Sequence, residues 1–156
     1  MATLVELRQY LGTLATILWN YGATFPVPTL DNYETGEVGF EFAAALPGAV
    51  SPEPAEIKLV EIWVPARHGD FHPGGYLYDF VEHPLNRRMA FHRHDEAYFV
   101  REFGVVVHEH CEERLKQPKC NHCFGLPVNA YEAIRRFVSL WGQPAALGCA
   151  GLRCIG

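Results

Sequence analysis

Histidines and cysteines crowd into the part of the chain that follows residue 67, and their side chains can do chemistry. All eight histidines lie between His68 and His122, and all five cysteines lie at or after Cys111. Imidazole nitrogens and thiolates are ligands for transition metals. Imidazole also titrates near neutral pH and serves as a general acid or base. The sequence therefore points to metal binding or proton transfer in this region.

Two His-x-His pairs, His92 with His94 and His108 with His110, carry the most specific pattern. In a β-strand, residues two apart point to the same face of the sheet. If the two segments pair as antiparallel strands about a turn near Arg101, His92 faces His110 and His94 faces His108. We expect one register to place all four imidazoles on one patch, in a shallow and partly exposed pocket.

Three interpretations of this patch are open. The histidines could bind a transition metal, with Asp95, Glu109 or Cys111 nearby. They could supply acid and base groups to a reaction. They could also be ordinary histidines at the end of a sheet, each bonded to backbone or water, and a one-residue slip in register would disperse them.

The remaining cysteines form a second candidate metal site. Cys120 and Cys123 form a C-x2-C pair, and Cys149 and Cys154 form a C-x4-C pair. The first spacing suits a zinc knuckle, whereas the second is wider than the usual gap. No strand leads directly into the first pair, so a thioredoxin-like redox motif is not favoured. Structural zinc, unligated thiols and a disulfide or redox role all stay open.

The pattern of apolar residues predicts the elements that must position these groups. An apolar stripe predicts a helix over residues 3–21, stopped by Gly22. A last helix opens at Asn129, with Glu132 three residues later, and ends at Gly142. A tight turn is expected at residues 83–86, with loops at 25–35 and 66–75. Strands are expected over residues 37–46, 57–64, 76–82, 87–94 and 103–111.

This order of elements indicates an α+β fold. We expect a single domain over residues 1–156, with an antiparallel sheet of about five strands and an N-terminal and a C-terminal helix packed on it. The net charge of −5 argues against a broad nucleic-acid-binding face. Residues 1–6 lack the basic segment of a secretory signal and the cysteine count is odd, so we expect a cytoplasmic protein with no membrane span.

Residues 76–94 read YLYDFVEHPLNRRMAFHRH. This stretch resembles the centre of the TumE-like toxin family of prokaryotic toxin–antitoxin systems. The matching features are a Tyr-Asp pair, a charged turn, a His-Arg-His, an aromatic segment and a C-terminal helix. In this chain they are Tyr78 and Asp79, Arg87 and Arg88, His92 to His94, Tyr98 and Phe99, and the helix that opens at Asn129. The resemblance implies a small toxin that acts on RNA and is neutralised by a cognate antitoxin.

An endoribonuclease of this kind needs a base, an acid and a cation for the phosphate. His92 and His94 would supply the acid and base, arginines would hold the phosphate, and Asp79 would complete the site. The arginines concerned are Arg87, Arg88 and Arg93.

The alternative is a non-catalytic, zinc-binding interaction protein built on the histidines and cysteines. A third reading is a metal-dependent enzyme on the same sheet face. We expect zinc or another divalent transition metal as the cofactor, and an antitoxin, an RNA substrate or a second copy in a homodimer as partners.

Overall fold

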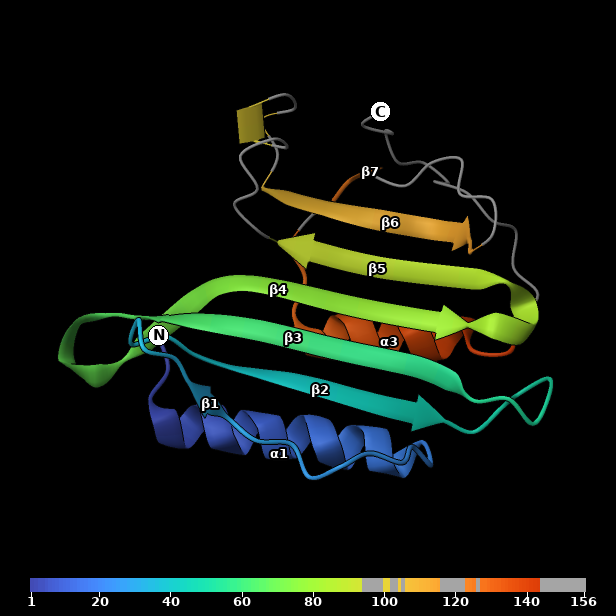
Figure 1. Cartoon of the computed structure of the whole chain (residues 1–156), viewed down its shortest axis with the longest axis horizontal. Helices are drawn as coiled ribbons and strands as arrows, with labels where there is room; N and C mark the ends of the chain where they lie inside the picture. The colour runs from blue at the N-terminus through green and yellow to red at the C-terminus, as the bar shows by residue number, and fades with distance from the viewer. Residues whose placement is uncertain (94–99, 102–103, 105, 116–122, 126, 144–156) are drawn as a thin grey trace.

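The computed structural model describes residues 1–93, 100–101, 104, 106–115, 123–125 and 127–143 (Figure 1). Its central element is a seven-stranded antiparallel sheet in which the strands follow one another in chain order. One helix precedes the sheet and one follows it. The α+β class expected from the sequence is confirmed. Neither helix, among the described residues, is long and apolar enough to cross a bilayer.

The N-terminal helix, α1 (Leu4–Asn20), begins and ends on local signals. The Thr3 side chain accepts a hydrogen bond from the Glu6 backbone N–H, while the Thr3 N–H donates to the Glu6 carboxylate at 2.7 Å. This capping box satisfies two backbone groups that the helix itself cannot pair. Gly22 follows the helix with a φ of +79°, a left-handed conformation that favours glycine. The helix predicted over residues 3–21 is therefore confirmed within a residue or two.

Five long strands and two short ones make up the sheet. The five long strands match the five expected ones, although their limits differ. The strands are β1 (Asp31–Asn32), β2 (Val38–Leu46), β3 (Ala55–Pro65), β4 (Phe71–Glu82), β5 (Arg87–Arg93), β6 (Val107–Arg114) and β7 (Cys123–Phe124).

The largest difference lies in the hairpin between β3 and β4. Residues 71–75, expected in a loop, continue β4, and Phe71 pairs with Pro65. The register shifts next to the Trp63–Pro73 pair. A bulge accommodates a proline, which has no N–H to give to the ladder. The expected loop is thereby reduced to a short 3-10 turn, η1 (Arg67–Gly69).

The C-terminal helix, α3 (Ala130–Leu140), begins where the sequence predicts. The Asn129 side chain accepts a hydrogen bond from the Glu132 N–H at 2.9 Å. The Glu132 carboxylate does not complete a capping box, because it accepts from Arg135 and Arg136 instead. Gly142, with a φ of +71°, follows the helix end.

Both helices cover the same face of the sheet. The core contains Phe42 of β2, Phe80 of β4 and Phe137 of α3, together with three leucines of α1, Leu11, Leu14 and Leu18. The Phe137 ring stacks on Phe80 at 5.4 Å and on Phe91 of β5 at 5.7 Å between centroids. Because strand residues alternate between faces, the neighbours of Phe91 point away from the helices. The sheet thus offers two different surfaces for function, one under the helices and one opposite them.

Candidate functional site

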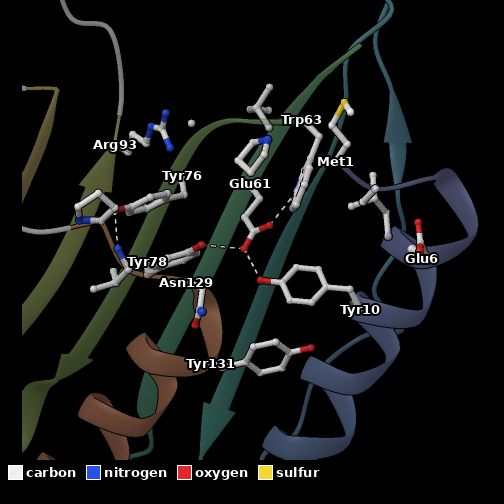
Figure 2. Close-up of a pocket in the computed structure, with 17 residues that line it drawn as sticks. Met1, Glu6, Tyr10, Glu61, Trp63, Tyr76, Tyr78, Arg93, Asn129 and Tyr131 are labelled. Atoms are coloured by element: carbon white, nitrogen blue, oxygen red, sulfur yellow. Dashed lines mark hydrogen bonds between the residues drawn. The ribbon is translucent and has the colours of Figure 1, made fainter. Parts of the chain in front are cut away.

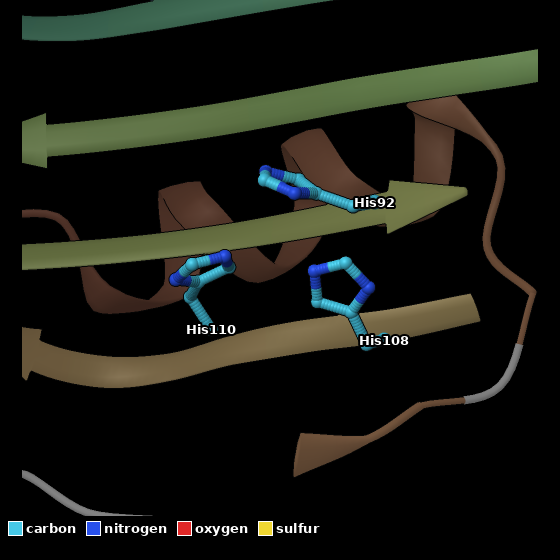
Figure 3. A group of neighbouring side chains, drawn as sticks. All are labelled: His92, His108 and His110. Carbon is cyan, nitrogen blue, oxygen red and sulfur yellow. The ribbon is translucent and has the colours of Figure 1, made fainter. Parts of the chain in front are cut away.

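Three histidines meet on the sheet face that points away from the helices. His92 comes from β5, and His108 and His110 come from β6, the neighbouring strand. The His92 ring centroid lies 5.0 Å from that of His108 and 4.7 Å from that of His110. One nitrogen from each ring lies within 4.8 Å of the others (Figure 3). We call this group the histidine cluster.

The shared face of these three histidines was predicted, but the register was wrong. His92 pairs with His108, and Ala90 pairs with His110, whereas His92 was expected opposite His110. A shift of two residues keeps every side chain on its face, so the cluster forms despite the error. His94 lies outside the described residues.

A β-bulge accompanies this pairing. Between the Arg88–Glu113 and Ala90–His110 pairs, β5 has one residue and β6 has two. The extra residue in β6 changes the register part of the way along the strand, as bulges do. Sequence periodicity cannot predict this position, since it depends on how the two strands fit together.

The histidine cluster is more deeply buried than the expected shallow pocket. His108 is 1% exposed and His110 is 7% exposed, while His92 is half-buried. His92 also lines a hollow of about 320 Å³ together with Val60, Ile62 and Leu77. Access to the cluster is therefore expected from the His92 side.

Glu109, expected beside the metal, points to the other face. It lies between His108 and His110 in β6, so alternation turns its side chain toward the helices. Its carboxylate is 3.7 Å from the Arg136 guanidinium of α3. Burial raises the pKa of Glu109, and the charge of Arg136 acts in the opposite direction. Glu109 therefore belongs to the packing of α3 and not to the histidine cluster.

The expected ribonuclease residues are divided between the two faces. Asp79 and Arg88 share the face of His92 and form an ion pair, with Oδ2 and Nη2 2.8 Å apart. Arg93 pairs with Tyr76 on the helix side, where it lines a different pocket, and it also borders the hollow beside His92. Arg87 is 2% exposed and bonds to Glu82 and to backbone carbonyls at the end of α3. Arg87 is thus structural, which corrects its expected role as a phosphate ligand.

Of the four cysteines in the expected zinc site, Cys123 lies within the described residues. Cys123 lies in β7, which pairs with β6. Cys120, Cys149 and Cys154 lie outside the described residues, as do Asp95, Tyr98 and Phe99. Structural zinc at the cysteines stays a prediction.

A second pocket, which sequence reasoning missed, lies under the helices. It has a volume of about 620 Å³ and is bounded by α1, the start of α3 and strands β3 to β5. Glu61 lies at its centre and is 4% exposed. Its Oε1 accepts hydrogen bonds from the hydroxyls of Tyr10 at 2.6 Å and Tyr78 at 2.7 Å (Figure 2). Its Oε2 accepts a third bond from the Trp63 indole N–H at 2.8 Å. We call it the Glu61 pocket.

The electrostatics of the Glu61 pocket follow from burial. Removal from water raises the pKa of the Glu61 carboxyl, while its three hydrogen bonds act in the opposite direction. Burial and the nearby Glu61 raise the pKa of Tyr10 and Tyr78 far above the ordinary value.

One signal in the sequence marks the Glu61 pocket. Glu61 occupies the same strand face as Ile57 and Leu59, where the period of two predicts an apolar residue.

Comparisons of the chain with protein-family models, curated proteins and solved structures found no match.

Proposed function

We propose that this protein binds a divalent transition-metal ion through His92, His108 and His110. The observation that carries the proposal is the convergence of three imidazoles from two strands, with nitrogens within 4.8 Å. Small rotations of the rings would bring the nitrogens to the metal–nitrogen distance of about 2.0–2.1 Å found for zinc. Imidazole suits zinc, copper, nickel and iron, so the ligand type favours this class of metal.

The position of the histidine cluster supports the proposal. Paired strands hold ligands more precisely than loops do. Burial also disfavours a charged side chain, and neutral imidazole is the form that ligates a metal. Three histidine ligands leave one coordination position of a four-coordinate ion, which a further ligand or a water molecule can fill.

RNA cleavage by a toxin-like protein with an antitoxin partner is the second candidate. The placement of Asp79, Arg88 and His92 on one sheet face favours it. Its support is smaller, because Arg88 already pairs with Asp79 and Arg93 lies on the opposite face. The net charge of −5 also opposes RNA binding, which depends largely on attraction to phosphates.

The first prediction is metal content. Protein stripped with a chelator and titrated with zinc, cobalt or nickel should bind about one ion per chain at the cluster, as measured by calorimetry and elemental analysis. His92→Gln should weaken binding at least about tenfold, because even the loss of a group that only supports a ligand costs 10–100-fold. His92 is half-buried, so this variant is expected to fold.

Two control variants make the test specific. His72→Gln changes an exposed histidine of β4 outside the cluster and should bind like wild type. Cys120→Ser tests the cysteines and should retain the cluster metal. Unchanged metal affinity in both His92→Gln and His110→Gln would exclude the proposed site. Cleavage of RNA by chelator-treated protein, lost in His92→Gln, would favour the second candidate.

A further inference from the structure

We propose that the Glu61 pocket binds a small organic molecule that carries a protonated amine. The pocket lies on the opposite side of the sheet from the histidine cluster, so this inference is independent of the metal site. Its volume of about 620 Å³ falls within the range of about 300–1,000 Å³ typical of small-molecule sites.

The polar centre of the pocket presents acceptors of hydrogen bonds. The hydroxyl protons of Tyr10 and Tyr78 and the indole proton of Trp63 are all directed to the Glu61 carboxylate. A carboxylate has about four acceptor positions, so three bonds leave room for one more donor. Among the described residues, Glu61 Oε2 accepts one bond, from Trp63, whereas Oε1 accepts two, and the oxygen of Tyr78 keeps a lone pair after donating its proton. A ligand that meets this centre must therefore bring a hydrogen-bond donor.

The charge of the centre favours a cationic donor over a neutral one. The Glu61 carboxylate is 4% exposed, and interactions between charges are much stronger away from water. A buried charge is costly unless it is paired or well hydrogen-bonded. An ammonium group would add both a hydrogen bond and an opposite charge, which a hydroxyl group of the same size cannot do.

Aromatic side chains form the walls around this centre. The Tyr10 ring packs edge-to-face against Tyr131 at 5.3 Å and Trp63 at 6.4 Å between centroids. On the other side, the rings of Tyr76 and Tyr78 stack at 4.6 Å. Aromatic ring faces attract cations, and Trp and Tyr do so most strongly. The walls would also bury the apolar part of a ligand, so an amine on an aromatic or aliphatic body suits the pocket.

Arg93 adds a second requirement at the edge of the pocket. It lies beside Tyr76, on the side away from Tyr10 (Figure 2). Glu61 thus places a negative charge at the centre of the cavity, and Arg93 places a positive charge at its edge. A guanidinium binds carboxylates with paired hydrogen bonds. A ligand with an amine and a carboxylate, such as an amino acid with an aromatic side chain, therefore matches the pocket better than an amine alone.

Binding to the wild-type protein tests the inference directly. We expect saturable binding of phenethylamine, measured by calorimetry. Phenethyl alcohol has the same shape without the charge and should bind at least about tenfold more weakly. Phenylalanine, which adds the carboxylate, should bind more tightly than phenethylamine. Equal affinities for the amine and the alcohol, tighter binding of hydrocinnamate than of phenethylamine, or no binding of any probe would overturn the inference.

Variants locate the binding at this pocket. Glu61→Gln should remove the preference for the amine over the alcohol. Since an amide in place of Glu61 would set N–H against N–H at Trp63, a second variant is needed that leaves the buried network intact. Tyr131 is 40% exposed, and Tyr131→Ala removes one wall, which should weaken phenethylamine binding at least about threefold.

Arg93→Gln should reduce the advantage of phenylalanine over phenethylamine. Arg135→Gln, on the exposed side of α3, should leave every affinity unchanged. Amine binding that is unaffected by both Glu61→Gln and Tyr131→Ala would place the ligand elsewhere and overturn the assignment.

Discussion

Among single residues, Glu61 shows how one buried charge organises its surroundings. Three side chains from α1, β3 and β4 donate to its two oxygens. Glu61 and Tyr78 are buried, and Tyr10 and Trp63 are half-buried, so the network is expected to tolerate the loss of a member poorly. Its signal in the sequence is a single acidic residue at an apolar position of β3, whereas the tyrosine partners are brought together only by the fold.

The tyrosines of this network give a prediction for alkaline pH. Burial and the nearby Glu61 raise the pKa of Tyr10 and Tyr78 well above the ordinary 10.0. In the unfolded chain both tyrosines release protons near pH 10.0, whereas in the folded protein they do not. Stability is therefore full below pH 10.0 and falls above it, by about 1.4 kcal/mol per pH unit for each such tyrosine.

Tyr78→Phe should remove one tyrosine's share of this pH dependence. The variant should also lose about 1.5–3 kcal/mol at neutral pH, because its hydroxyl no longer bonds to the carboxylate. Urea unfolding at neutral pH and above pH 10.0 measures both effects. Tyr21→Phe, at an exposed position, should keep the wild-type decline. If the free energy of unfolding falls equally steeply with pH in Tyr78→Phe and in wild type, the prediction is contradicted.

The histidine cluster shows what can be predicted for single residues from periodicity. The period of two correctly assigned His92, His108 and His110 to one face, because that assignment needs only strand geometry. The pairing partner of each histidine was wrong, because a shift of two residues leaves every side chain on its face and the period of two cannot distinguish the two registers. Arg93 lies on the opposite face of the sheet from Asp79 and Arg88, because successive strand residues alternate between the two faces.

Among the secondary-structure elements, local signals predicted the ends of helices better than the ends of strands. The caps at Thr3 and Asn129 are formed by residues next to the helices, so the sequence displays them directly. The limits of β4 depend on how far it pairs with β3, and not on signals within β4 itself. Residues 71–75 thus join the sheet although prolines and glycines there are typical of loops.

The end of α3 is fixed to the sheet by a buried ion pair. Arg87 of β5 and Glu82 of β4 are each 2% exposed, and their Nη2 and Oε2 atoms are 2.6 Å apart. Arg87 also donates to the carbonyls of Leu140 and Gln143, and Glu82 accepts from the Gly142 N–H at 2.8 Å. The pair thus forms hydrogen bonds with backbone groups at the end of α3 that have no partner within the helix.

Arg87→Met should lower the free energy of unfolding by about 3–5 kcal/mol, since it leaves the Glu82 charge buried without its cation. Lys58→Met is the matched control, because it breaks the exposed Lys58–Glu41 pair of the same sheet and should cost about 0–1 kcal/mol. Denaturant unfolding gives both values. Similar losses in the two variants would show that the buried pair does not hold α3.

In the whole molecule, one sheet separates two sites of different chemistry. The histidine cluster lies on the face opposite the helices, and the Glu61 pocket lies between the sheet and both helices. Apolar residues in the helices and strands predicted that the helices would pack on the sheet. They did not predict a pocket there, because a cavity depends on how side chains from α1, α3 and the sheet fail to fill the space between them.

The last prediction concerns the stability of the whole protein. The histidine cluster exists only when β5 and β6 pair, so a metal ion that binds there favours the folded state over the unfolded chain. Zinc at 100 times its dissociation constant should add about 2.7 kcal/mol to the free energy of unfolding. The midpoint of thermal unfolding should rise with zinc concentration in wild type and His72→Gln.

His92→Gln should lose most of this rise at the same zinc concentration. If zinc binds but the unfolding midpoint stays constant in wild type, the ion occupies a site that persists in the unfolded chain, such as local cysteines. If His92→Gln and wild type rise equally, the stabilising ion lies away from the histidine cluster. Unfolding with phenethylamine alone and with phenethylamine and zinc together adds a check on the separation of the two sites. Its effect should add to that of the metal, because ligands at independent sites contribute separately to stability.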